Sequence, residues 1–288
     1  MSSEPWTVKR LLEWTQQFLR EKGIDSPRLD AEILLAHVLQ CKRIDLYVRS
    51  AEEPEEVART TFRGLIKRRV EGCPVAYLVG ERAFFLLTFE VTPSVLIPRP
   101  ETEDLVAEGL RIIKEQATPR ILDIGTGSGC IAISIVHQHK TVQATAVDVS
   151  PEALAVAQRN AARHNIAERI RFLESDLFSA IPGGERFNLI LSNPPYIADH
   201  EFAGLAVDVR EHEPRLALDG GTDGLSVYRR LIAAAPDYLE PGGTLLLEIG
   251  ATQEIAVSGL LETQGDFESI RTLKDRAGHP RVLAAKRR

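Results

Sequence analysis

Short apolar runs alternate with segments of helical periodicity from about residue 119 onward, and this alternation constrains the fold more than any other feature. Strands that alternate with helices along a chain form a mostly parallel sheet that is covered on both faces. The sequence therefore predicts an α/β fold. The predicted strands are 120–124, 142–147, 170–173, 187–192, 244–249 and two more within 267–286, and the predicted helices are 130–137, 151–164, 225–238 and 253–261.

The first 80 or so residues follow another pattern, with apolar residues at spacings of three and four. That spacing predicts amphipathic helices. We expect one helix from Val8 to a stop at Gly23, a second from Ser26-Pro27 to Gln40, and a third from Pro54 to Arg69. Aromatic and β-branched residues in 83–97 predict a short β-hairpin. The expected division is a helical domain (1–82), a hairpin linker (83–97) and an α/β domain (98–288).

Composition excludes several classes of protein. The net charge is −6, from 35 Lys and Arg against 41 Asp and Glu, so stable binding to nucleic acid is not expected. The three cysteines, Cys41, Cys73 and Cys130, are far apart and lack metal-ligand spacing, which favours free thiols in a reducing compartment. The sequence has no apolar run typical of a signal peptide or a membrane helix. We therefore expect a cytoplasmic monomer without a bound metal.

A glycine-rich segment, Gly125-Thr126-Gly127-Ser128-Gly129, joins the first strand of the α/β pattern to the helix after it. Glycine there allows positive φ and close approach of a ligand to the backbone, and a helix N-terminus adds unpaired N–H groups. Asp148 ends the next strand, where a carboxylate can accept hydrogen bonds from both hydroxyls of a ribose. These features predict a nucleotide-like cofactor.

Two cofactors suit this arrangement. A dinucleotide site has the spacing Gly-x-Gly-x-x-Gly, but here Cys130 occupies the place of the third glycine. Asp123 would repel a pyrophosphate and would suit the ammonium group of a methionine moiety, which favours S-adenosylmethionine over a nicotinamide dinucleotide. After the third strand, Asp176 could bind the adenine amino group with Leu177 or Phe178 against the ring, or it could simply cap a helix. The predicted cofactor-binding residues are Asp123, Gly125, Thr126, Gly127, Ser128, Gly129, Asp148, Asp176, Leu177 and Asn193.

The segment Asn193-Pro194-Pro195-Tyr196 stops another apolar strand abruptly, because neither proline has an N–H to donate. Ligands of open α/β sheets bind at this end of the strands. The Asn193 side chain and the Pro194 backbone carbonyl could accept both protons of a planar NH2 group, and the Tyr196 ring could cover it. The pattern predicts a clamp for a nitrogen that accepts a methyl group. It leaves open whether the acceptor is a nucleobase or an amide, and the plainer alternative is a turn that only ends the strand.

Together, 123–129, Asp148 and 193–196 resemble the class I methyltransferases that modify planar NH2 groups. Over essentially the whole chain, the sequence is similar to the bacterial peptide chain release factor glutamine N5-methyltransferases, the PrmC/HemK family. This closer resemblance rests on Tyr77-Leu78-Val79-Gly80, Phe84, the segment 96–103 (Leu-Ile-Pro-Arg-Pro-Glu-Thr-Glu), Asp208-Val209-Arg210 and Glu213-Pro214.

The resemblance implies a seven-stranded sheet with its last strand antiparallel. It also implies methyl transfer from S-adenosylmethionine to the glutamine of the Gly-Gly-Gln loop of class 1 release factors. The helical domain would recognise that protein, and Pro98, Arg99 and Pro100 would shape the wall between hairpin and cofactor cleft. Some family members have tryptophan in place of Leu177, beside the adenine. The implied site comprises catalytic Asn193, Pro194 and Tyr196, and substrate-binding Asn193, Pro194, Pro195, Tyr196 and Arg99.

Three other functions compete with this one. An adenine N6-methyltransferase of nucleic acid can use the same Asn-Pro-Pro-Tyr stop, but a duplex enzyme must flip its base, and the sequence shows no obvious groove-reading insertion. The glycine spacing disfavours a nicotinamide-dependent dehydrogenase. A non-catalytic adaptor would be expected to lose Asn193 or Asp148, and both are present.

Overall fold

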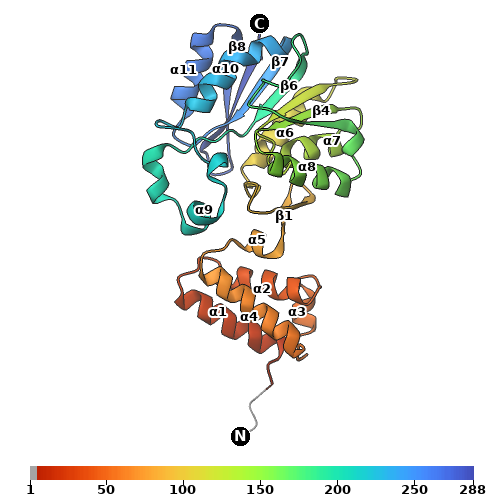
Figure 1. Ribbon diagram of the computed structural model, residues 1–288, viewed down its shortest axis with the longest axis vertical. Helices are drawn as coiled ribbons and strands as arrows, with labels where there is room; N and C mark the ends of the chain where they lie inside the picture. Colours follow the sequence, from red (N-terminus) through yellow and green to blue (C-terminus); the bar gives the residue numbers. More distant parts are fainter. Residues whose placement is uncertain (1–4) are drawn as a thin grey trace. The chain divides into compact units, whose positions relative to one another are not determined.

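The computed structural model describes residues 5–288, and the chain separates into two compact units (Figure 1). The first unit runs up to Gly80 and includes Ala206–His212, and the second comprises Glu81–Leu205 and Glu213–Arg288. The domain boundaries expected after residues 82 and 97 stay predictions. In the structure the hairpin belongs with the second unit.

The first unit is helical. The three long helices predicted from the sequence are present, and Leu19, Leu34 and Leu35 are fully buried in the core between them. The first helix begins where the Thr7 side chain accepts a hydrogen bond from the Arg10 N–H, which is a typical N-cap. The helices are α1 (Val8–Glu21), α2 (Pro27–Val38), α3 (Asp45–Val48), α4 (Glu56–Val70), α5 (Val75–Val79) and, from the distant segment, α9 (Val207–His212).

The second unit is built on a seven-stranded sheet. Its strands are β3 (Arg120–Ile124), β4 (Gln143–Asp148), β5 (Ile170–Glu174), β6 (Phe187–Ser192), β7 (Leu239–Glu248), β8 (Phe267–Lys274) and β9 (Pro280–Arg287). The order across the sheet is β5-β4-β3-β6-β7-β9-β8, and β9 runs antiparallel to both of its neighbours while the other pairs are parallel. This sheet confirms the expected fold.

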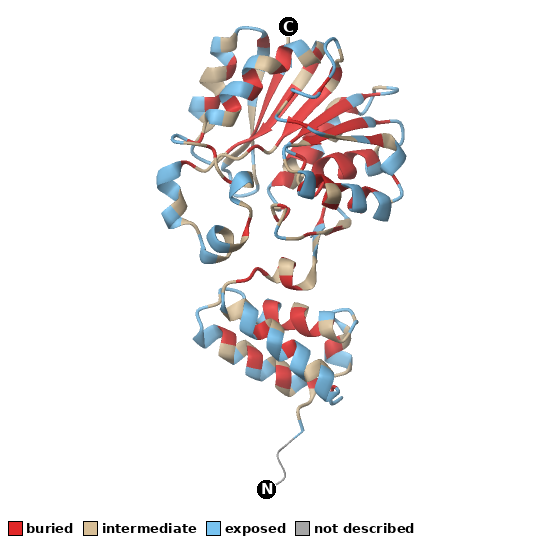
Figure 2. Cartoon of the chain, in the orientation of Figure 1, coloured by how far each residue is buried: buried red, intermediate tan, exposed pale blue. Residues whose placement is uncertain are grey.

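Helices cover both faces of the sheet, whose strands are largely buried (Figure 2). Successive side chains of a strand point to opposite faces, so Ile121 joins the apolar cluster on one face and Leu122 joins the cluster on the other. The first face is covered by α6 (Thr102–Ile113), α7 (Cys130–Gln138) and α8 (Pro151–Arg163), and the second by α10 (Ser226–Tyr238) and α11 (Glu254–Gln264). Three short 3-10 turns complete the unit: η1 (Ala167–Arg169), η2 (Asp199–Gly204) and η3 (Arg215–Ala217).

The short helices α3, α5 and α9 were not predicted from the sequence. Three larger differences lie in the second unit. Helix α6 was not predicted, because the prolines at 98 and 100 made its start look like part of a linker. Strand β7 begins at Leu239 rather than Thr244: the pairing with β6 shifts register between Phe187 and Leu189, which accommodates a Pro-Gly-Gly segment that resembles a turn. The hairpin strands β1 (Glu81–Phe84) and β2 (Leu87–Glu90) end well before residue 97. Within residues 5–288, no helix has both the length and the apolar composition that crossing a bilayer requires.

Candidate active site

A cavity of about 410 Å³ lies at the carboxyl ends of four adjacent parallel strands. Its walls include 124–128 after β3, 148–150 after β4, 175–177 after β5 and 192–195 after β6. This volume is within the range of small-molecule sites, and the carboxyl edge is where open α/β sheets bind ligands. Most of the predicted cofactor and acceptor residues therefore meet in one place.

The three glycines of the loop after β3 have different roles. Their φ angles are 71°, 54° and 81° at Gly125, Gly127 and Gly129, a region that disfavours side chains. A Cβ at Gly125 or Gly127 would meet no atom of the described chain within 4 Å, whereas one at Gly129 would lie 2.6 Å from Ile133 Cδ1. The first two glycines thus leave the loop backbone open to the cavity. Gly129, predicted to contact the cofactor, instead permits close packing and is not among the described residues that line the cavity.

Asp123 lies under this loop and is fully buried. Its Oδ2 accepts hydrogen bonds from Thr126 Oγ1 (2.7 Å) and the Ala132 N–H (3.2 Å). Burial raises the pKa of Asp123 to about 6, against the lowering effect of these two hydrogen bonds. The sequence predicts direct contact of Asp123 with a ligand. In the structure, the buried carboxyl instead holds the loop through these two hydrogen bonds. Its Oδ1 has no hydrogen-bond partner among residues 5–288, so one acceptor is left there.

Asp148, at the end of β4, faces the cavity and also shapes its rim. One carboxylate oxygen accepts from the Gly127 N–H (2.8 Å) and the other from the Ser150 N–H (3.0 Å). Burial raises the pKa of Asp148, while the backbone hydrogen bonds from Ser150 and Gly127 oppose that rise. The carboxylate thus joins two strand-end loops at the position predicted for ribose recognition.

After β5, Asp176 and Leu177 both line the cavity. The Asp176 carboxylate forms an exposed ion pair with Arg230 of α10 (2.7 Å), and no helix follows it within residues 177–186, so the helix-cap alternative is wrong. Leu177 has a φ of 53°. Phe178 is buried and stacks on Tyr238, with ring centroids 4.5 Å apart. Leu177 rather than Phe178 is therefore the residue available to a ligand ring.

After β6, Asn193, Pro194 and Pro195 line the cavity as expected. The Asn193 side chain donates from Nδ2 to Thr102 Oγ1 (3.3 Å), which leaves its Oδ1 as the acceptor. Tyr196, predicted to cover the acceptor group, is not one of the described lining residues. Its ring packs on the apolar cluster beneath the second face of the sheet, and its backbone carbonyl accepts from Gln253 Nε2 (3.0 Å).

Arg99 also lines the cavity, where it was predicted to form part of the wall. Its Nη2 lies 2.6 Å from Glu213 Oε1, and the Ile97 N–H donates to the other oxygen of the same carboxylate (3.4 Å). Glu213 is buried, and the segment 214–217 that follows it contributes Pro214, Leu216 and Ala217 to the cavity. This ion pair fixes the two segments that face the strand ends.

Two family models match the chain: the PrmC N-terminal domain over residues 10–80 and the methyltransferase small domain over residues 107–210. The chain is 46% identical over 284 residues to the release factor glutamine methyltransferase of Rhodopirellula baltica, which covers 97% of this chain and 96% of that protein. It is 45% identical over 285 residues to the protein of the same name from Geobacter sulfurreducens, with 98% of both chains covered. The chain belongs to the release factor glutamine methyltransferase family.

Family membership confirms the resemblance seen in the sequence and identifies the chain as a methyltransferase. A distant solved structure, the hMettl16 catalytic domain in complex with a MAT2A 3′UTR hairpin, has the same fold. It is 17% identical, with a TM-score of 0.58, and covers 77% of this chain and 81% of that one.

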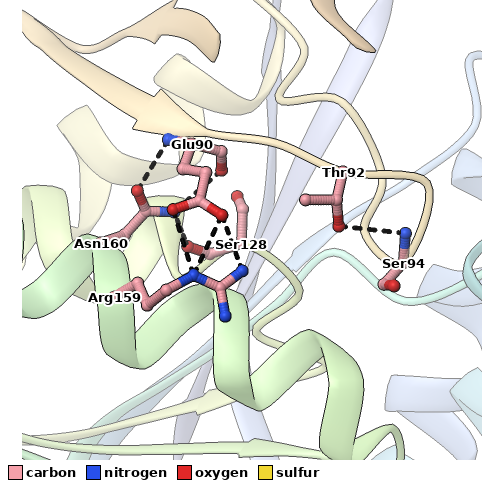
Figure 3. Close-up of polar contacts among 6 residues, drawn as sticks. All are labelled: Glu90, Thr92, Ser94, Ser128, Arg159 and Asn160. Atoms are coloured by element: carbon pink, nitrogen blue, oxygen red, sulfur yellow. Dashed lines mark hydrogen bonds and ion pairs between the residues drawn. The ribbon is translucent and has the colours of Figure 1, made fainter. Parts of the chain in front are cut away.

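Asn160 of α8 supports the site of this family member, and no pattern in the sequence indicated that role (Figure 3). It is fully buried. Its Nδ2 donates to the carbonyls of Glu90 (3.0 Å) and Ser128 (2.9 Å), and its Oδ1 accepts from the Glu90 N–H (2.7 Å). Asn160 thus ties β2 of the hairpin to the glycine-rich loop. Beyond β2, the Ser94 N–H donates to Thr92 Oγ1 (3.3 Å), and Ser94 reaches the cavity wall.

Asn160→Ala is expected to lower the free energy of unfolding by about 3 kcal/mol. One buried and two partly buried backbone groups lose their partner, at about 1–3 kcal/mol each, and part of that loss is relieved by water. The neighbouring Arg159→Ala serves as the control. Arg159 is half-exposed and pairs with the Glu90 carboxylate (2.7 Å), so its loss should cost about 0–1 kcal/mol. Urea unfolding of both variants measures the difference, and equal losses would contradict the assigned role of Asn160.

Proposed function

We propose that this protein transfers a methyl group from S-adenosylmethionine to the side-chain amide nitrogen, N5, of the glutamine in the Gly-Gly-Gln motif of class 1 peptide chain release factors. The supporting observation is that the Asn193-Pro194-Pro195 stop and Asp148 line one cavity, in a chain whose full-length relatives are named release factor glutamine methyltransferases. Such a protein would act as a cytoplasmic monomer and support translation termination, and its helical first unit would recognise the release factor.

The residues present fit S-adenosylmethionine. This cofactor has no phosphate, so the carboxylates Asp123 and Asp148 do not repel it. Asp148 and Leu177 both line the cavity. Asp148 would accept hydrogen bonds from ribose hydroxyls, and Leu177 would make an apolar contact with adenine. When bound, the cofactor supplies a methyl group on a positively charged sulfur.

The acceptor amide is held by two oxygens of this chain. Its nitrogen is a poor nucleophile because the lone pair is delocalised, so both N–H groups must be fixed and their growing positive charge stabilised. Asn193 Oδ1 and the Pro194 carbonyl would provide these acceptors, each worth about 2.7–4 kcal/mol where water is excluded. The nitrogen gains the methyl group and loses one proton to water. A strong base is not required, since an N-methylated amide cation is very acidic.

The proposal is tested with labelled S-adenosylmethionine and three acceptors in separate reactions. These are a class 1 release factor, the same factor with its Gly-Gly-Gln glutamine replaced by alanine, and duplex DNA containing adenine. We expect label on the first acceptor alone. Label on the DNA with none on the release factor would favour the adenine N6-methyltransferase alternative, because Asn193 and Pro194 can clamp either planar NH2 group.

A further inference from the structure

Two buried polar residues beside Asn193 have no part in the mechanism described so far. Thr102 begins α6 and Glu248 ends β7, and both are 2% exposed. Ser192 pairs with Leu247 in the parallel register of β6 and β7, so Asn193 and Glu248 follow at adjacent strand ends. Thr102 lines the cavity and accepts a hydrogen bond from Asn193 Nδ2 (3.3 Å). The three side chains are therefore neighbours at the acceptor end of the cavity.

The chemistry of these three side chains decides which of them donates and which accepts each hydrogen bond. Glu248 Oε2 is a buried acceptor that has no hydrogen-bond partner in the described part of the chain, and the neighbouring Thr102 hydroxyl lowers the pKa of this carboxyl. An ionised carboxylate only accepts, so the Thr102 hydroxyl is the neighbouring group that can donate its single hydrogen to Glu248. A lone pair of Thr102 Oγ1 then remains for the Asn193 NH2 group. With Nδ2 engaged in this way, Oδ1 is the amide atom left for a substrate.

We propose that Thr102 and Glu248 are positioning residues that hold the Asn193 amide with its oxygen toward the substrate N–H. The proposal deepens the methyl-transfer function and rests on it. A substrate amide NH2 donates only. If the Asn193 amide were turned by 180°, its own NH2 group would face the substrate NH2, and two donors would lie opposite each other. Free Asn193 can adopt either orientation. The Thr102 hydroxyl excludes the turned one when it donates to the Glu248 carboxylate, because its oxygen can then only accept from Asn193.

The charge state of Glu248 therefore matters. Burial raises the pKa of Glu248 to about 7, while the Thr102 hydroxyl and the cations Arg281 and Arg99 oppose that rise and Glu101 adds to it. Below about pH 7 the carboxyl takes up a proton and becomes a donor to Thr102. The Thr102 hydrogen is then free to donate to the Asn193 amide oxygen, which reverses the amide. The other titratable groups that face Glu248 are Tyr196, Tyr228 and Cys130, and burial raises the pKa of each, so all three stay neutral.

The test uses Thr102→Val, which removes the hydroxyl at nearly constant volume, Thr102→Ser, which keeps it, and Glu248→Gln, which removes the charge and adds an NH2 donor that does not titrate. We expect Thr102→Val and Glu248→Gln to lower kcat about 10–100-fold with cofactor affinity within about threefold of wild type. Thr102→Ser should recover most of the activity that Thr102→Val loses. Glu240→Gln, the same substitution at the opposite end of β7, is the matched control.

The pH profile separates positioning from packing. Wild-type kcat should fall as pH drops through about 7, and Glu248→Gln should lose this dependence between about pH 6 and 8 while Glu240→Gln keeps it. This comparison still decides the matter if Thr102→Val folds poorly. Suppose that the wild type is active and that Glu248→Gln has a normal kcat with the same fall below about pH 7. That result overturns this inference alone. A wild type that methylates no release factor overturns the proposed function instead.

Discussion

Replacing Asn193 by alanine is expected to lower kcat about 10²–10³-fold while the affinity for S-adenosylmethionine changes by less than about threefold. The substitution removes one of the two oxygens that would hold the acceptor nitrogen, and a preorganised group of this kind contributes about 2.7–4 kcal/mol to the transition state. The cavity lining from β3, β4 and β5 is untouched by the change. Single-turnover transfer of label to a release factor, combined with calorimetric titration of the cofactor, measures both quantities.

Asn188→Ala is the matched control for this experiment. Asn188 lies on the same strand at the end far from the cavity, and its Oδ1 accepts from the Arg120 N–H (2.8 Å). Its loss should leave kcat within about threefold of wild type, as is usual for substitutions away from the reacting atoms. Near-normal turnover by Asn193→Ala would show that the clamp is not formed by this side chain. Equal losses in both variants would indicate damage to β6 rather than to the acceptor site.

Much of the fold of the second unit could be predicted because its central strands are short apolar runs with polar or Gly/Pro ends. Strand β6 was predicted with its observed bounds, Phe187–Ser192. Prediction was weaker where the local composition favours one structure and the tertiary packing favours another. Pro241-Gly242-Gly243 has turn composition, yet it lies inside β7 because a register shift on β6 accommodates it.

Residues directly after a strand were the predictable part of the site, because parallel strands bring their carboxyl ends together. Their partners were not predictable: Thr102 and Asn193 are 91 residues apart, and Asn160 and Glu90 are 70 apart. Periodicity carries no information on such pairings. For the same reason the sequence could not tell whether Leu177 or Phe178 faces a ligand: Leu177 lines the cavity and Phe178 packs in the core.

Asp148→Ala is expected to weaken binding of S-adenosylmethionine about 10²–10³-fold, the largest effect on affinity that we expect from one substitution. The carboxylate would make two hydrogen bonds to ribose hydroxyls, each worth about 1.5–3 kcal/mol when the acceptor is charged, and 1.4 kcal/mol corresponds to tenfold. The change also releases the N–H groups of Gly127 and Ser150, which loosens the loops on either side. Isothermal titration calorimetry measures the affinity directly.

Asp176→Ala provides the comparison, because it removes a carboxylate from the same cavity at the next strand end. The Asp176 carboxylate is exposed and paired with Arg230, so its loss should weaken binding no more than about tenfold. Since burial raises the pKa of Asp148, wild-type affinity should also fall as the pH is lowered through that pKa, and Asp148→Ala should lose this dependence. A larger loss from Asp176→Ala than from Asp148→Ala would mean that the ribose lies against the loop after β5 and not at the end of β4.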